Sequence, residues 1–142
     1  MEAVAIIRCR GHPLVRGTHP TTFEVTKEAH LTEAGDCIIG IGADKGAADL
    51  PAEFRTILAR DDARLITRLA CGDQTVEIHA QGSAKMTLAH PTDLVWRRSS
   101  FVCSRTIGIH ADFVAETLPR ELIAALAQGE EMTVGLRAVS PG

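Results

Sequence analysis

The sequence contains no tyrosine, and its only aromatic residues are one tryptophan and four phenylalanines in 142 positions. The core must therefore come from Ile, Val, Leu and Ala, and the bases of a nucleic acid would find few rings to stack on. No apolar run approaches the ~18 residues that a membrane helix needs. An acid, Glu2, stands where a secretory signal carries bases, so we expect a cytoplasmic protein without membrane contact.

Cysteine is scarce, and the four residues Cys9, Cys37, Cys71 and Cys103 form no CxxC pair. Their spacing excludes a zinc ribbon, and in a cytosolic chain we expect free thiols that pack as small apolar side chains. The motifs GxxxxGK[ST], GxGxxG, GxSxG and HExxH are also absent. Their absence argues against ATP hydrolysis, nicotinamide chemistry and α/β-hydrolase chemistry, and the missing HExxH removes one pattern of metal ligands.

Strong net charge is absent too, since the chain carries −3 with a pI of about 6.0. No global field attracts a polyanion, and a nucleic-acid partner is therefore disfavoured. The apolar share of 45% and charged share of 23% are ordinary for a soluble globular protein. The length corresponds to a single domain, residues 1–142.

An internal repeat is the strongest pattern in the sequence. Residues 41–58 match residues 109–126 at eight of 18 positions, 68 apart, including Ala43-Asp44 against Ala111-Asp112. The tripeptide His19-Pro20-Thr21 returns as His90-Pro91-Thr92, 71 positions on. These matches predict a duplication into repeats of about 1–71 and 72–142, with a loop three residues longer in the first repeat, near residues 28–35.

Each repeat is expected to contain three strands, a short helix and a last strand. The helices should begin near Pro51 and Pro119, with Asp49 and Thr117 as caps and Gly129 ending the second. Branched and apolar patterns predict strands at 4–10, 22–27, 37–43 and 64–71, then at 75–81, 94–98, 106–111 and 131–138.

The fold class is therefore α+β and rich in strands. Two repeats related by a pseudo-twofold axis would remove exposed sheet edges by closing a small barrel or sandwich with two short helices. Residues 31–39 resemble the Gly-Asp turn of duplicated cradle-loop barrels. A two-layer α+β sheet is the alternative.

Most candidate site residues lie in the turns of the first repeat, and three candidate arginines lie in the second. Imidazoles titrate near neutral pH, acids can orient them, and arginines can hold a phosphate or carboxylate. The catalytic candidates are His12, His19, Asp36 and Cys37, and the ligand-binding candidates are Thr21, Thr22, Glu24, Arg97, Arg98 and Arg105. The competing interpretation is a set of tight turns with solvated polar side chains.

Three runs of sequence, GHPLVRGTHPTTFEVTK, LTEAGDCIIGIGADKG and SSFVCSRTIGIHAD, resemble an archaeal family known as domain of unknown function 371. The resemblance extends over essentially the whole chain. It implies an archaeal cytosolic source and brings no activity, cofactor or catalytic residue with it.

Two chemical hypotheses attach to particular residues. We predict that His12 and His19 lie on the same end of the fold. A site for a divalent metal is an open alternative, but the favoured explanation for these histidines is that they belong to surface turns. Cys37 is equivalent to Arg105 in the repeat, and a guanidinium nearby would lower its thiol pKa. The alternative, which alternation along the strand favours, is an inert Cys37 packed in the core beside Ile39.

The sequence favours a small-molecule or anion site and does not decide whether that site is catalytic. A structural or assembly subunit ranks second, because Trp96 beside Arg97 and Arg98 suits an interface. An RNA-binding module ranks third. Homo-oligomer formation stays open.

Overall fold

The computed structural model describes residues 1–31 and 35–142, so part of the 31–39 segment compared with cradle-loop barrels lies outside the described residues. Eight strands and two α-helices follow one another in two similar series. The first series is β1 (Glu2–Arg10), β2 (Thr22–Thr26), β3 (Ile38–Gly40), α1 (Ala52–Leu58) and β4 (Arg64–Cys71). The second is β5 (Gln74–Gln81), β6 (Asp93–Arg97), β7 (Thr106–Gly108), α2 (Arg120–Ala127) and β8 (Glu131–Val139).

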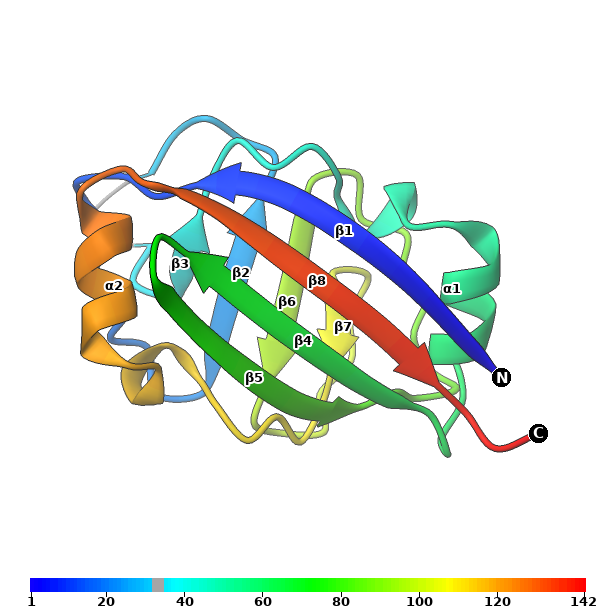
Figure 1. Cartoon of the computed structure of the whole chain (residues 1–142). Helices are drawn as coiled ribbons and strands as arrows, with labels where there is room; N and C mark the ends of the chain where they lie inside the picture. The colour runs from blue at the N-terminus through cyan, green and yellow to red at the C-terminus, as the bar shows by residue number, and fades with distance from the viewer. Residues whose placement is uncertain (32–34) are drawn as a thin grey trace.

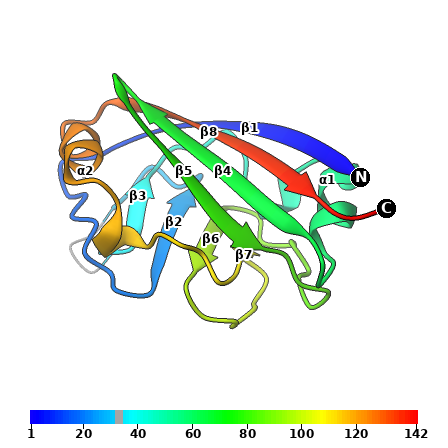
Figure 2. The ribbon, with the colours of Figure 1, turned by 60° about the horizontal axis from the view of Figure 1, so that its bottom comes forward.

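The strands form two stacked sheets of four. The first sheet is antiparallel with the order β1-β8-β4-β5, and the second has the order β3-β2-β6-β7. In the second sheet β2 and β6 are antiparallel, while β3 and β7 run parallel to their neighbours. Figure 2 shows the sheets as two layers, with α2 at one end and α1 at the other. The molecule is therefore a two-layer α+β structure.

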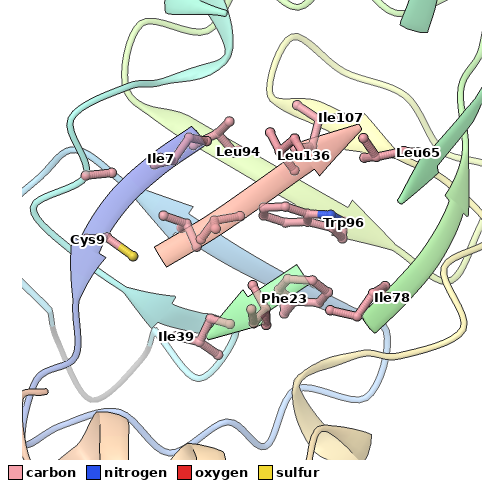
Figure 3. Close-up of a cluster of buried hydrophobic side chains, with 14 of the residues drawn as sticks. Ile7, Cys9, Phe23, Ile39, Leu65, Ile78, Leu94, Trp96, Ile107 and Leu136 are labelled. Atoms are coloured by element: carbon pink, nitrogen blue, oxygen red, sulfur yellow. The ribbon is translucent and has the colours of Figure 1, made fainter. Parts of the chain in front are cut away.

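The core fills the space between the sheets. Ile7, Leu65 and Leu136 of the first sheet face Phe23 and Trp96 of the second, as Figure 3 shows. Phe23 and Trp96 are cross-strand partners, and their rings stack with centroids 4.4 Å apart. The indole Nε1–H of Trp96 donates a hydrogen bond of 2.9 Å to the Thr67 hydroxyl, so the one polar atom of this ring is satisfied inside the core.

In residues 1–31 and 35–142, the strands do not close into the expected barrel. Single bridges, Arg10 with Ile41 and Gln81 with Ile109, connect the sheets beyond the ends of the short strands β3 and β7. These two strands are only three residues long, whereas the sequence predicted them to run to Ala43 and Ala111. The chain leaves the ladder early at both places, so single bridges rather than continuous ladders connect the two sheets.

The predicted helix starts are confirmed, with Pro51 and Pro119 immediately before α1 and α2. The predicted caps are wrong in detail, because neither α-helix has a side-chain cap. Asp49 instead accepts a hydrogen bond from the Gly46 backbone N–H, and Thr117 accepts one from the Val114 N–H. Both therefore close the 3₁₀ turns Ala47–Asp49 and Ala115–Thr117 that precede the helices.

The two halves make matching contacts. Asp44 accepts a hydrogen bond from the Arg8 backbone N–H, and Asp112 accepts one from the His79 N–H. The two aspartates that match in the sequence therefore make the same kind of contact, each with a backbone N–H of the first strand in its series. The β2–β3 connection, 27–37, is three residues longer than the β6–β7 connection, 98–105, as predicted.

Candidate functional site

A polar surface lies on the second sheet, on the side away from the core. Side chains alternate along a strand, so Phe23 and Val25 of β2 enter the core while Glu24 between them points outward. On β6, Leu94 and Trp96 enter the core and their neighbours face outward. We call the outward group, together with three residues of the loop before and at the start of β7, the polar face: Glu24, Asp93, Arg97, Cys103, Arg105 and Thr106.

Arg105 connects two carboxylates on this face. Its Nη1 lies 3.3 Å from Oε1 of Glu24 and 3.3 Å from Oδ2 of Asp93. Asp93 also accepts hydrogen bonds from the hydroxyls of Thr26, at 2.7 Å, and Thr92, at 2.9 Å. Partial burial acts to raise the pKa of Asp93, but these hydrogen bonds outweigh it and lower that pKa. Of the two carboxyl groups beside Arg105, Asp93 is therefore the one that stays ionised.

The pKa of Glu24 is shifted in the opposite direction. This residue is only 5% exposed, and among the described residues its ion pair is with the Arg105 guanidinium. Burial raises the pKa of the Glu24 carboxyl to about 7, and the charge of Asp93 adds to this effect, while Arg105 and Arg97 oppose it. The structure thus holds a carboxyl that exchanges its proton near neutral pH.

Cys103 lies against a guanidinium. Nη2 of Arg97 is 3.3 Å from its sulfur, and Nε of Arg97 donates to the Thr106 hydroxyl at 2.9 Å. The Thr106 oxygen also accepts from the Cys103 backbone N–H, so its own proton is free to point to the sulfur 3.6 Å away. Partial burial acts to raise the thiol pKa, but the Arg105 N–H, the Thr106 hydroxyl and Arg97 outweigh it and lower the pKa to about 7.

The hypothesis of a lowered thiol pKa concerned Cys37, whereas the structure places the lowered pKa on Cys103. Burial raises the pKa of Cys37, and the charges of Glu24 and Asp36 raise it further. Cys37 also does not pack beside Ile39 in the core, since it forms a hydrogen bond with the Thr22 side chain and lies next to Glu24. The equivalence with Arg105 nevertheless appears in the backbone. The Cys37 carbonyl accepts from the Glu24 N–H, and the Arg105 carbonyl accepts from the Val95 N–H.

The side chains of the candidate histidines form hydrogen bonds within their own turns. Nδ1 of His12 accepts the Leu14 backbone N–H at 3.0 Å, and Nδ1 of His19 accepts the N–H groups of Thr21 and Thr22 at 3.2 Å each. The same roles occur in the second half, where the Ser83 hydroxyl accepts the Lys85 N–H and His90 accepts those of Thr92 and Asp93. Within residues 1–31 and 35–142, no contact joins His12 to His19.

The two histidine turns meet opposite ends of α2. Gly11, next to His12, packs against Leu126 near the end of that helix. The carbonyl of Gly17 accepts a hydrogen bond from Arg120 at its start, and the His19 carbonyl accepts the Glu116 N–H just before it. The structure therefore gives no support to a ligand shared by the two rings.

Four further residues singled out in the sequence have clear positions in the structure. The Asp36 carbonyl accepts the backbone N–H groups of Thr18 and His19, so this segment holds the turn. Thr21 and Arg98 are exposed, and the Arg98 N–H donates to the Thr21 carbonyl. The second-ranked hypothesis, an assembly subunit, used Trp96 as an interface residue. Trp96 is instead completely buried, because alternation along β6 turns it into the core between two outward-facing residues.

Sequence reasoning missed Asp93, Cys103 and Thr106. Asp93 follows the second His-Pro-Thr turn, and it pairs with Thr26 across the β2–β6 ladder. Cys103 lies three residues before Thr106, in a loop without a helical or strand pattern. Only the pairing of β6 with β2 and β7 brings these residues beside Glu24 and Arg97. Among the described residues, no group of three or more His, Cys, Asp or Glu side chains is placed to hold a metal ion.

Comparison with known proteins identifies the family. A model of the domain of unknown function DUF371 matches residues 7–139. The chain belongs to the DUF371 family. The matched region of this DUF371 protein includes every residue of the polar face.

A relative of this DUF371 protein comes from the archaeon Methanocaldococcus jannaschii, the uncharacterized protein MJ0206. The two are 40% identical over 127 residues, which cover 89% of this chain and 93% of the relative. Neither the family description nor the relative's name states an activity. In the part of the chain that the structure describes, no helix is long and apolar enough to cross a membrane.

Proposed function

We propose that the polar face binds a small molecule that carries a carboxylate or phosphate group, with Arg97 and Arg105 as its anchors. The observation that carries this proposal is the position of Arg105, which reaches over a buried carboxyl while its own side chain stays 44% exposed. A guanidinium held in place by two acids is oriented before a ligand arrives, and this reduces the entropy cost of binding.

The donor count supports a further partner. Each guanidinium has five N–H donors. Within the described chain, the contacts of Arg97 are with Thr106 and Cys103, and those of Arg105 are with Glu24, Asp93 and Cys103. Donors therefore remain on both groups for a carboxylate or phosphate, which guanidinium recognises through paired hydrogen bonds.

Proton exchange near neutral pH supports a role in chemistry as well as binding. Glu24 and Cys103 both have a pKa of about 7, reached from opposite directions, and both lie beside the arginine anchors. Phe101 lies over Arg97, with the guanidinium carbon 5.0 Å from the ring centroid, and its ring is 59% exposed. An aromatic ring at that position would shield a bound group from water. Catalysis, if it follows binding, would use the Cys103 thiolate as nucleophile and Glu24 as proton donor.

The proposal is tested by thermal unfolding with inorganic phosphate, citrate and pyrophosphate at constant ionic strength. We expect at least one of these anions to raise the unfolding temperature of the wild-type protein. Arg105→Gln and Arg97→Gln should abolish that increase, whereas Arg16→Gln, at an exposed loop position, should keep it. An equal response of all four proteins would mean general salt stabilisation and would refute the site. No response of the wild type to any anion would do the same.

We also infer that the single domain, residues 1–142, consists of two copies of one half-length unit, about 1–71 and 72–142. The order of elements supports this, and so do two cross-strand pairs. Glu24 pairs with Val95, 71 positions on, and Arg68 pairs with Gly135, 67 positions on. In each pair, a residue of one half pairs with its counterpart in the other half. A pseudo-twofold axis that passes through both pairs would produce this arrangement. The two halves of many family members should match each other at these offsets more often than shuffled sequences do; random agreement would refute the duplication.

We propose that the protein is located in the cytoplasm. All four cysteines are free, and Cys9 and Cys71 are buried as apolar side chains. Free thiols are typical of reducing compartments. Fractionation of cells that produce the tagged protein checks this, and recovery outside the cytoplasmic fraction would contradict it.

A further inference from the structure

The outer face of the first sheet carries exposed aliphatic side chains. Val4 is 66% exposed and Ile6 is 49% exposed, and both point outward from β1. With Ile66 of β4 they border a shallow groove of about 480 Å³. Figure 1 looks onto this sheet, and both helices lie at its ends rather than across it. The apolar groove is thus available for contact with another molecule.

The strand register fixes how the outward side chains are arranged. One row across β1, β8, β4 and β5 contains Val4, Arg137, Ile66 and His79. The next row contains Ile6, Gly135, Arg68 and Glu77. Glu2 of β1 lies outside the first row, and Arg8 lies outside the second. Along β1, the acid Glu2 and the base Arg8 therefore occupy opposite ends of the same face. Within one chain, Oε1 of Glu2 also lies 3.1 Å from Nη1 of Arg137, and Nε2 of His79 lies 2.9 Å from Oε2 of Glu77.

We propose that this face is a homodimer interface, in which a second copy of the chain packs sheet against sheet. The twofold axis lies in the plane between the first sheet of one copy and the first sheet of its partner. It runs perpendicular to the strands and passes between the two rows of side chains. It places Glu2 opposite the partner's Arg8, Val4 opposite the partner's Ile6, and His79 opposite the partner's Glu77. The proposal does not depend on the function of the polar face, which lies on the other sheet.

Shape complementarity follows the same axis. Gly135 has no side chain, and it leaves a depression between Ile6 and Arg68. The axis brings Arg137, which stands in the other row on the same strand, over the partner's Gly135. Ile66 meets the aliphatic part of the partner's Arg68, a contact in which the long side chain covers apolar surface. Each protruding side chain near the centre therefore faces a hollow or an apolar surface.

The size of the face limits the affinity. Four strands about 4.8 Å apart and about eight residues long at ~3.3 Å per residue span on the order of 500 Å². Stable interfaces bury about 800 Å² per partner. The flat area of the face is smaller than this value, although protruding side chains and contacts at the rim add to it. We therefore expect a dimer that dissociates on dilution.

Sedimentation velocity over a hundredfold concentration range tests the proposal. We expect a monomer–dimer equilibrium for the wild type. Ile6→Glu, which places a charge in the apolar part of the interface, should raise the dissociation constant at least tenfold. Phe101→Glu changes an equally exposed apolar residue near the polar face and should leave the constant unchanged.

A charge exchange tests the geometry itself. Glu2→Arg should weaken the dimer, and the double variant Glu2→Arg/Arg8→Glu should recover most of the loss because the opposite charges still meet across the axis. A wild type that stays monomeric throughout the range would overturn the interface. A dimer that Ile6→Glu does not weaken would place the contact elsewhere, and a double variant without recovery would overturn the proposed axis.

Discussion

The sulfur of Cys103 lies 3.3 Å from Nη2 of Arg97. This contact joins the end of β6 to the loop that follows it and places a thiol beside a fixed positive charge. A cation at this distance stabilises the thiolate, which is the nucleophilic form of cysteine. The relationship makes Cys103 the most reactive of the four thiols in our expectation.

Alkylation with iodoacetamide as a function of pH should follow this order. The Cys103 rate should rise with a midpoint near its pKa of about 7. Arg97→Gln removes the nearest charge, so the midpoint should move up and the rate at pH 7 should fall. Cys37, whose pKa is raised by burial, should react more slowly at pH 7. Mass spectrometry of the modified peptides separates the sites; preferential labelling of Cys37, or an unchanged midpoint in Arg97→Gln, would contradict the assignment.

Glu24 should make folding stability depend on pH. Its pKa is about 7 in the folded protein against an ordinary 4.5, so the folded state binds the proton more tightly. This stability is therefore present below about 4.5 and is lost as pH rises through 7, at most on the order of 3 kcal/mol. Glu24→Gln should flatten the slope between pH 5 and 8 in urea unfolding. Glu53→Gln, exposed on α1, is the control and should retain the slope.

Gly11 and Gly82 should not tolerate a methyl group. A Cβ at Gly11 would lie 1.9 Å from the Leu126 carbonyl oxygen, and one at Gly82 would lie 2.1 Å from that of Leu58. Either alanine would push a helix off the strand that it contacts, at a cost of about 3 kcal/mol. Gly135→Ala has no atom nearer than 3.9 Å and is the matched control. Urea unfolding measures all three, and equal midpoints would show that the helices can shift freely.

The hydrogen bond between Trp96 and Thr67 should contribute to stability. Thr67→Val keeps the shape of the side chain but leaves the buried indole N–H without its acceptor, at a cost of about 1–3 kcal/mol. Thr75→Val, at an exposed position of β5, should stay within about 0.5 kcal/mol of the wild type. Chemical denaturation followed by tryptophan fluorescence provides the measurement. A loss no larger than that of the control would mean that the indole finds another partner.

The sequence by itself determined most of the local structure. The predicted strand 64–71 agrees with β4, and the helices begin directly after Pro51 and Pro119. Gly129, with φ of +81°, ends the second helix as expected. These features depend on neighbouring residues: side-chain alternation, the missing N–H of proline and the left-handed freedom of glycine. The sequence also matched Asp44 with Asp112, and each of these carboxylates accepts a backbone N–H.

Only the tertiary structure decided which polar residues form a site. Glu24 and Arg105 are 81 positions apart, and the pKa of Cys103 is lowered by the Arg105 backbone N–H, the Thr106 hydroxyl and Arg97 of the preceding strand. The sequence placed the histidines at the centre of the chemistry, but their Nδ1 atoms hold turns. The pairing of β2 with β6 created the polar face, because a pKa depends on burial and on charges brought close by folding, and neither is encoded in the order of residues along one strand.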